Sequence, residues 1–241
     1  MSDADSVFVL LHGFTNTGAS WQPVIDALGP HRQTVAPDIG GHGPEARRPV
    51  TLETVLGDLE RVAPERFALC GYSMGGRIAL HAALSMPDRV QRLVLIGASP
   101  GIADGPERSA RREADERLAT EIEGLEIETF ARRWAQTPIL AGVAPEMAAA
   151  AHADRLRSTP TGLAAALRGL GTGALTPVWD RLAELTMPVT MIVGERDAKF
   201  TAIAEQMAMA IPDAQLHVVP GAGHAVHLER PDAVAELLLG V

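Results

Sequence analysis

One short motif, glycine-x-serine-x-glycine at positions 71–75, constrains the fold of this chain more than any other feature. It follows an apolar run, Arg66 to Leu69, that predicts a buried strand, and it precedes a helical pattern over Ile78 to Leu84. The two glycines permit a tight strand-to-helix turn, because they carry no Cβ that would clash. Such a turn lifts the Ser73 hydroxyl onto a helix N-terminus, where negative charge is favoured. The context therefore favours a nucleophile elbow over a glycine-rich turn with an incidental serine.

Further strand-like runs alternate with helical patterns on both sides of this motif. The expected strands are Val7–Leu11, Arg32–Pro37, Val90–Ile96, Val189–Val193 and Leu216–Val219. The expected helices between them include Trp21–Leu28, Thr51–Val62 with Thr51 as N-cap, and Glu205–Ile211. Continuous apolar strands that alternate with helices predict a mostly parallel central sheet flanked by helices.

The pattern changes between about Gly101 and Arg181, where strand-like runs disappear. Four helical, arginine-bearing segments take their place: Glu107–Glu123, Glu128–Ala135, Pro145–Ser158 and Thr161–Leu170. We interpret residues 101–181 as a helical cap inserted into a core formed by 1–100 and 182–241. Such an insertion covers the carboxyl edge of the sheet, where sites of α/β proteins lie.

Two further residues complete a candidate catalytic triad with Ser73. Asp197 follows the strand that ends at Val193, and His224 follows the last strand. In this order His224 accepts the Ser73 proton, and Asp197 holds the imidazole in the required tautomer. Glu195 is the rival acid, but the position at the end of the turn favours Asp197. We expect His81, His152 and His227 to be packing or surface residues.

Composition excludes several classes of protein. The chain has 241 residues, a net charge of −9 and a pI of about 5.3, which argues against nonspecific nucleic-acid binding. No apolar run is long enough for membrane insertion, and the acidic start Met1–Asp5 does not resemble a secretory signal. The single cysteine, Cys70, is expected in the core and fits a cytoplasmic location. No metal-ligand cluster or dinucleotide fingerprint is present, so no metal and no cofactor are expected, and the oligomeric state is left open.

The elbow and the triad order resemble those of the α/β-hydrolase superfamily, which implies an α/β-hydrolase fold. In that superfamily a His-Gly pair after the first strand, here His12-Gly13, precedes a residue that supplies one oxyanion-hole N–H. The resemblance assigns this role to Phe14, and the second N–H to Met74, which follows the serine. The superfamily hosts many reactions, so it does not fix the chemistry.

Finer matches resemble one family of menaquinone biosynthesis, the 2-succinyl-6-hydroxy-2,4-cyclohexadiene-1-carboxylate (SHCHC) synthases. The similar segments are Leu10–Thr15, Gly71–Arg77, Ala98–Gly101, Gly162–Gly173, Asp197–Phe200 and Ala222–Glu229. They cover nearly the whole chain, the expected cap included. The resemblance implies a lyase that expels pyruvate from a cyclohexene with three carboxylates, 2-succinyl-5-enolpyruvyl-6-hydroxy-3-cyclohexene-1-carboxylate.

A small polycarboxylate of this kind requires fixed cations near the triad. Arg77 lies four residues after Ser73, so both share one helix face, and its planar fork suits a carboxylate. Arg111 or Arg112, with Arg112 preferred, and Arg168 are expected to add cations from the cap. The resemblance further implies that Tyr72, Trp134 and Arg168 line the pocket. The alternative for each cap arginine is a solvated face, since Glu107, Glu113, Asp115 and Glu116 lie nearby.

The expected mechanism uses Ser73, with His224 and Asp197, as a general base. Two other functions fit the same motifs. The first is a carboxylic-ester or thioester hydrolase in which Ser73 is the nucleophile, and the second is a noncatalytic ligand-binding member of the superfamily. The arginines argue against the first, and an intact triad with two oxyanion elements argues against the second.

Overall fold

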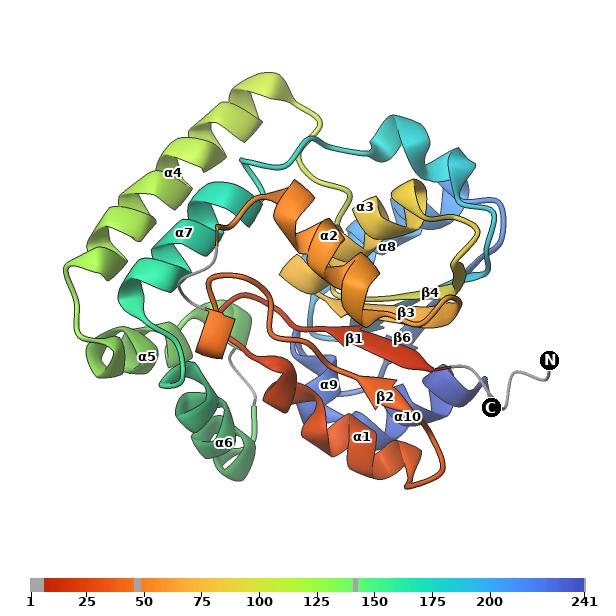
Figure 1. Ribbon diagram of the computed structural model, residues 1–241, viewed down its shortest axis with the longest axis horizontal. Helices are drawn as coiled ribbons and strands as arrows, with labels where there is room; N and C mark the ends of the chain where they lie inside the picture. Colours follow the sequence, from red (N-terminus) through yellow and green to blue (C-terminus); the bar gives the residue numbers. More distant parts are fainter. Residues whose placement is uncertain (1–6, 46–48, 141–142, 241) are drawn as a thin grey trace.

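Six parallel strands form one sheet in the computed structural model, which describes residues 7–45, 49–140 and 143–240 (Figure 1). The strands are β1 (Phe8–Leu11), β2 (Thr34–Val35), β3 (Phe67–Tyr72), β4 (Val90–Ile96), β5 (Val189–Gly194) and β6 (Ala214–Val219). Their order across the sheet is β2-β1-β3-β4-β5-β6, and every neighbouring pair is parallel. The predicted parallel α/β sheet is confirmed. The acidic segment Met1–Asp5 lies outside the described residues.

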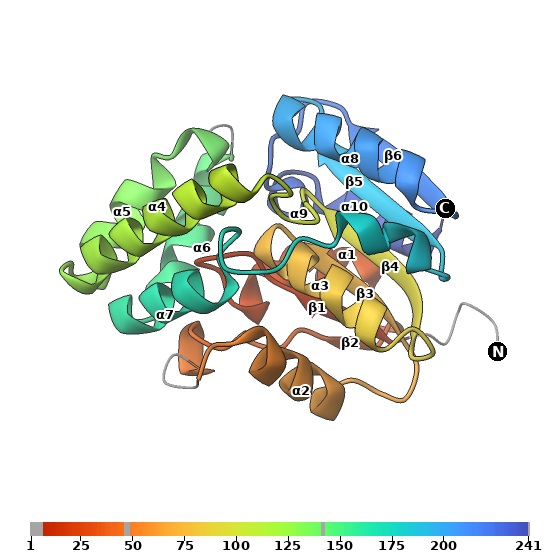
Figure 2. The same ribbon diagram turned by 90° about the horizontal axis from the view of Figure 1, so that it is seen from above.

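Helices cover both faces of the sheet, as Figures 1 and 2 show. One face carries α1 (Gln22–Leu28), α9 (Val226–Glu229) and α10 (Pro231–Leu239), and the other carries α2 (Leu52–Val62), α3 (Met74–Ser85) and α8 (Ala198–Ala210). Side chains of β1 alternate between these layers, with Phe8 and Leu10 in the first and Val9 and Leu11 in the second. Cys70 is buried in β3 as expected, and burial raises the pKa of its thiol.

Helix boundaries follow local capping and differ in part from the sequence prediction. Thr51 is the N-cap of α2, as predicted, and its hydroxyl accepts a hydrogen bond from the Thr54 N–H at 3.1 Å. The predicted helix over 205–211 covers only the second half of α8. This helix begins at Ala198 because Asp197 acts as its N-cap and accepts from the Phe200 N–H at 3.4 Å. The predicted strand 32–37 shortens to the two residues of β2 at the sheet edge.

Four helices lie between β4 and β5, where the sequence predicted helical segments. They are α4 (Gly105–Glu123), α5 (Ile127–Ala135), α6 (Pro145–Arg155) and α7 (Pro160–Leu170). Figures 1 and 2 show them together at one end of the sheet, and α4, α5 and α7 share a small apolar cluster around Ile122, Phe130 and Leu163. The division into a core of 1–100 and 182–241 and a cap of 101–181 stays a prediction.

Short 3-10 helices complete the chain: η2 (Gly18–Trp21), η3 (Gly43–Glu45), η4 (Pro138–Leu140) and η5 (Trp179–Glu184). Buried polar contacts join α6 to the loop after β1. The Asp154 carboxylate accepts from the Thr17 N–H at 2.8 Å and from the Thr17 hydroxyl at 2.5 Å. Ser158, just beyond α6, accepts from the Gly43 N–H at 3.0 Å. The Thr17 contacts fix the end of α6 beside the loop that carries Phe14, and the Gly43 contact joins the same end to η3.

None of the helices in the part of the chain that the structure describes combines the length and apolar character needed to cross a bilayer.

Candidate active site

Ser73 lies in a strained turn between β3 and α3. Its φ of 52° and ψ of −108° place it in the left-handed half of backbone space, where residues other than glycine are uncommon. The turn is closely packed, since a Cβ at Gly71 would lie 2.4 Å from the Gly75 carbonyl oxygen. A Cβ at Gly75 would lie 2.2 Å from the carbonyl oxygen of Leu11. Both glycines of the motif are therefore required for the geometry that presents the serine hydroxyl.

The three predicted triad residues form a continuous hydrogen-bonded chain. His224 Nδ1 lies 2.6 Å from an Asp197 carboxylate oxygen, and His224 Nε2 lies 3.1 Å from Ser73 Oγ. A carboxylate only accepts, so Nδ1 carries the proton and Nε2 is free to accept from the serine hydroxyl. His224 is buried, whereas Ser73 and Asp197 are partly exposed and Ser73 lines a cavity. In this arrangement Ser73 and His224 can act together as a general base, or His224 can activate Ser73 as a nucleophile.

Glu195, the rival acid, points elsewhere and accepts from the Gly221 N–H at 2.8 Å. A second glutamate, Glu229, supports the His224 loop, although sequence reasoning gave it no role. Its carboxylate accepts from the Gly223 N–H at 2.9 Å and pairs with Arg196 at 2.7 Å. The sequence did hold a signal for this role, because Glu229 ends the similar segment Ala222–Glu229, five residues after His224.

Two residues with unpaired backbone N–H groups line the pocket that contains Ser73. They are Phe14, in the loop after β1, and Met74, the first residue of α3. Among the described residues no backbone or side-chain group accepts a hydrogen bond from either N–H. Both donors are therefore available to an oxygen that gains negative charge, which is the role predicted for them.

The cavity over Ser73, which we call the Ser73 pocket, has a volume of about 180 Å³. Its lining includes Phe14, Ser73, Met74, Arg77, Arg111, Trp134, Leu167, Leu170, Thr172, Lys199 and Phe200. The guanidinium of Arg77 is buried, and its Nη2 donates to the Leu170 carbonyl at 3.2 Å. Its Nε has no partner. Burial lowers the pKa of Arg77 to about 10, and the neighbouring Arg111 adds to this effect. Below this pH Arg77 presents an incompletely paired cation to the pocket.

The structure corrects the preference for Arg112. Arg111, and not Arg112, lines the Ser73 pocket, and its Nε donates to the buried carboxylate of Asp115 at 2.7 Å. Consecutive residues on a helix point about 100° apart, so only one of this pair can face the pocket. Asp115, buried one turn further along α4, selects Arg111.

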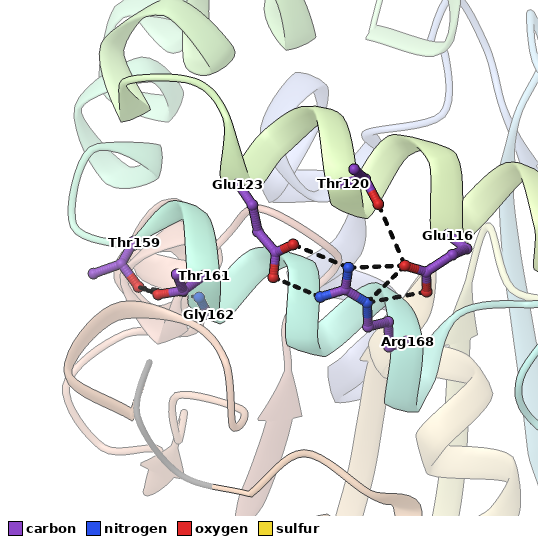
Figure 3. A network of polar contacts seen from close by, with 7 residues as sticks. All are labelled: Glu116, Thr120, Glu123, Thr159, Thr161, Gly162 and Arg168. Carbon is purple, nitrogen blue, oxygen red and sulfur yellow. Dashed lines mark hydrogen bonds and ion pairs between the residues drawn. The ribbon is translucent and has the colours of Figure 1, made fainter.

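Arg168 also departs from its expected place. It does not line the Ser73 pocket, and its guanidinium lies between two carboxylates of α4, as Figure 3 shows. Its Nη2 is 2.8 Å from Glu116, and its Nη1 is 2.5 Å from Glu123. Hydrogen bonds to Glu123 and Glu116 raise the pKa of Arg168 further. This arginine joins α7 to α4 on the outer surface, which is the solvated alternative considered for the cap arginines.

Replacing Arg168 with alanine is therefore expected to change the KM for a carboxylate substrate by no more than about twofold, because this side chain does not line the Ser73 pocket. Its exposed ion pairs also contribute little to stability. Steady-state kinetics would be compared with those of the Glu116→Gln and Glu123→Gln variants, which break the same pairs but keep the guanidinium. A large rise in KM for Arg168→Ala alone would mean that this side chain binds the substrate after all.

The two predicted aromatic pocket residues separate in the structure. Trp134 lines the Ser73 pocket and packs edge-on to Phe14, with 5.2 Å between ring centroids. Tyr72 is buried and does not line this pocket. Its ring lies between His224 at 5.3 Å and His227 at 4.1 Å, so it supports the triad histidine from behind. Tyr72 is the last residue of β3, and burial raises the pKa of its phenol.

Two basic residues near the site had no predicted role. Arg155, at the end of α6, is buried and donates from Nε to the Thr15 hydroxyl at 3.3 Å, beside the Phe14 loop. Lys199, in the first turn of α8, lines the Ser73 pocket. The signal for Lys199 was its place two residues after Asp197 in one of the similar segments. No group of three or more potential metal-ligating side chains occurs in the ranges 7–45, 49–140 and 143–240.

Comparisons with known proteins agree with this geometry. The model of the Alpha/beta hydrolase family matches residues 8–237. A putative 2-succinyl-6-hydroxy-2,4-cyclohexadiene-1-carboxylate synthase of Bacillus subtilis is 34% identical over 95% of this chain and 87% of its own length. The synthase of that name from Enterobacter sp. is 34% identical over 95% and 89%. The solved structure of MenH from S. aureus superposes with a TM-score of 0.92 at 30% identity, over 98% of this chain and 92% of that one.

Proposed function

Because this chain belongs to the alpha/beta hydrolase family and, within it, to the SHCHC synthases, we propose that it is a lyase that eliminates pyruvate from 2-succinyl-5-enolpyruvyl-6-hydroxy-3-cyclohexene-1-carboxylate. The product is SHCHC, the compound that the relatives are named for. The proposal assigns the chain a role in menaquinone biosynthesis and needs no cofactor for the chemistry.

The names of substrate and product define the bonds that change. A proton leaves ring carbon 2, next to the succinyl ketone, and its electron pair forms a double bond between carbons 2 and 3. The existing double bond moves to carbons 4 and 5, and the carbon–oxygen bond at carbon 5 breaks. The leaving enolpyruvate takes up a proton and becomes pyruvate. The protein therefore has to remove one proton, hold one enolate and bind three carboxylates.

Each requirement has a matching group in the Ser73 pocket. Ser73 accepts the proton from carbon 2 as its own proton passes to His224 Nε2, 3.1 Å away. Asp197, 2.6 Å from Nδ1, stabilises the imidazolium that forms. The unpaired N–H groups of Phe14 and Met74 hold the oxygen of the succinyl ketone as it becomes an enolate. No acyl group is transferred to the serine in this scheme.

The observation that carries the proposal is the buried guanidinium of Arg77, one helical turn after Ser73. A simple ester hydrolase has no use for a desolvated cation beside its nucleophile, and burying one is costly. A carboxylate in the pocket offsets that cost, because charge-assisted hydrogen bonds to arginine are strong and geometrically specific. Arg111, positioned by Asp115, lines the same space and supports the same class of ligand.

Replacing Arg77 with methionine, which fills similar space without charge, is expected to lower kcat/KM for pyruvate release by about a hundredfold. Hydrolysis of p-nitrophenyl acetate, which has no carboxylate, should fall much less. Both reactions would be followed in the same preparations, with thermal unfolding as the control for folding. An equal loss of both activities would mean that Arg77 supports the structure of α3 and does not bind a substrate carboxylate.

The alternative function is a carboxylic-ester or thioester hydrolase with Ser73 as nucleophile. The complete triad and the two unpaired N–H groups support it, because acyl transfer uses the same constellation. A covalent acyl-enzyme on Ser73 with fast turnover of simple esters would favour this function. The cationic lining of the pocket favours the elimination.

A further inference from the structure

A second cavity adjoins the Ser73 pocket and has a volume of about 600 Å³. We call it the outer chamber. The two cavities share Arg77, Arg111, Thr172, Lys199 and Phe200. From there the chamber continues between the start of α4, at Glu107, and α8, at Ile203. Ser73, Phe14 and Met74 do not line it. The outer chamber thus lies on the side of Arg77 away from the base and the oxyanion donors.

Size requires a substrate of the proposed kind to use this second space. The Ser73 pocket, at about 180 Å³, is smaller than the roughly 300–1,000 Å³ of typical sites for drug-sized ligands. A ring with succinyl, carboxylate and enolpyruvyl substituents is a ligand of that class. One of its arms must therefore leave the Ser73 pocket, and the outer chamber shares five lining residues with that pocket.

Lys199 lines both cavities. It is the only lysine among 21 basic residues in the sequence, since the other 20 are arginines. It is exposed, and no carboxylate pairs with it among the described residues. Its Nζ lies 5.8 Å from the centroid of the Phe200 ring. Arg111, by contrast, is paired with Asp115. Of the three cationic residues that line both cavities, Lys199 and Arg77 are therefore less neutralised than Arg111. The Nε of buried Arg77 has no partner.

We propose that the outer chamber is the subsite for the leaving enolpyruvyl group, and that Lys199 binds its carboxylate. This inference rests on the proposed function, which places proton removal at carbon 2 and the leaving group at carbon 5. These two carbons lie opposite each other in the ring. When carbon 2 faces Ser73, the substituent on carbon 5 points away from the base, toward the space that excludes Ser73 and continues past Arg77.

A lysine at this position also assists departure of the group. Breakage of the bond at carbon 5 sends its electron pair to the enol oxygen, so negative charge develops next to a carboxylate that is already ionised. The compact ammonium of Lys199 has three donors, so it can bind the enol oxygen and the carboxylate together. The open side of the chamber lets the product leave. Lys199 is then a substrate-binding residue that stabilises the leaving group, and the triad remains the base.

Selective acylation of amines tests the subsite without any turnover. Lys199 is the only lysine in the full chain, so acetylation by a water-soluble succinimidyl acetate can be followed at one side chain by peptide mass spectrometry. The α-amino group serves as internal reference. Millimolar pyruvate is expected to slow acetylation of Lys199 at least threefold relative to the reference, and pyruvamide, its neutral analogue, is expected to have no effect. Equal rates with both compounds would overturn the proposal.

Kinetics of two variants supply the second test. Lys199→Met is expected to raise both the KM for the tricarboxylate precursor and the inhibition constant of pyruvate by about tenfold, and Lys199→Arg should recover most of each loss. A tenfold rise in KM with an unchanged inhibition constant of pyruvate would mean that Lys199 binds another substituent of the substrate. That result would overturn the assignment. If the unaltered protein releases no pyruvate, the proposed function fails. The acetylation experiment still decides whether the chamber binds a keto-acid carboxylate.

Discussion

Replacing Ser73 with alanine is expected to lower pyruvate release by about 10³- to 10⁴-fold, because in the proposed mechanism its hydroxyl receives the substrate proton. The distance of 3.1 Å from Ser73 Oγ to His224 Nε2 carries this expectation. Substrate affinity should stay nearly unchanged, since the arginines that we propose to bind the carboxylates remain in place. The measurement is single-turnover pyruvate formation, together with quenching of tryptophan fluorescence by substrate, as Trp134 lines the pocket.

A matched variant, Asp197→Asn, separates the base from its orienting partner. The amide can donate to His224 Nδ1 and so favours the wrong imidazole tautomer, which should cost turnover without emptying the pocket. A variant lacking the Ser73 hydroxyl that retains full activity would remove the serine from the mechanism. Loss of binding in the same variant would mean that Ser73 mainly holds the substrate.

Acid is expected to destabilise the fold steeply below about pH 6.5, because three histidines are buried in their neutral form. Burial lowers the pKa of His12 to about 4 and the pKa values of His42 and His227 to about 3. In the unfolded chain these groups take up protons near pH 6.5. The stabilisation is therefore complete above pH 6.5 and is lost as the pH falls toward 4 and 3. Each imidazole contributes a slope of about 1.4 kcal/mol per pH unit at most.

The three imidazoles differ in how they are held. His12 Nε2 accepts from the Ile39 N–H at 2.9 Å, so protonation breaks a buried hydrogen bond. His42 Nδ1 lies 3.2 Å from the Ile39 carbonyl oxygen, and its Nε2 has no partner. Both ring nitrogens of His227 lack partners, and its ring packs between Trp21 and Tyr72.

Urea unfolding between pH 6.5 and 5 would measure this dependence. The substitution His227→Phe keeps a ring of similar size. It should reduce the slope by about one third, since it removes one of the three imidazoles whose pKa burial lowers to about 3 or 4. Its free energy of unfolding at pH 7 should not fall, because the ring nitrogens it removes are unsatisfied. His31→Gln, at an exposed loop residue, is the control for loss of an imidazole. An unchanged slope in His227→Phe would exclude His227 from the acid transition.

The fold and the hydrogen-bonded arrangement of Ser73, His224 and Asp197 were predictable because both depend on strand ends. Ser73, Asp197 and His224 each follow a strand, and parallel strands bring their carboxyl ends to one edge of the sheet. The extent of each strand was less predictable. The expected strand over 32–37 has only two paired residues because it borders the sheet at β2, where one neighbour is missing.

The arginines of the helices between β4 and β5 were not predictable to the residue. A shift of one position turns a side chain by about 100°, so the choice between Arg111 and Arg112 depends on Asp115, whose burial the sequence does not reveal. Arg168 meets Glu116 and Glu123 only after α7 packs on α4 (Figure 3). Arg155 lies at the end of an alanine-rich helix without a marked apolar face, and its burial arises from contact with the loop after β1.

The central claim is that this triad performs an elimination and not a hydrolysis. The most direct measurement is release of pyruvate from enzymatically generated 2-succinyl-5-enolpyruvyl-6-hydroxy-3-cyclohexene-1-carboxylate, in parallel with hydrolysis of p-nitrophenyl acetate by the same preparation. We predict rapid formation of pyruvate in equal amount to the diene product, with ester turnover far slower. Brisk ester hydrolysis without pyruvate would contradict the claim and assign Ser73 the role of an acyl nucleophile.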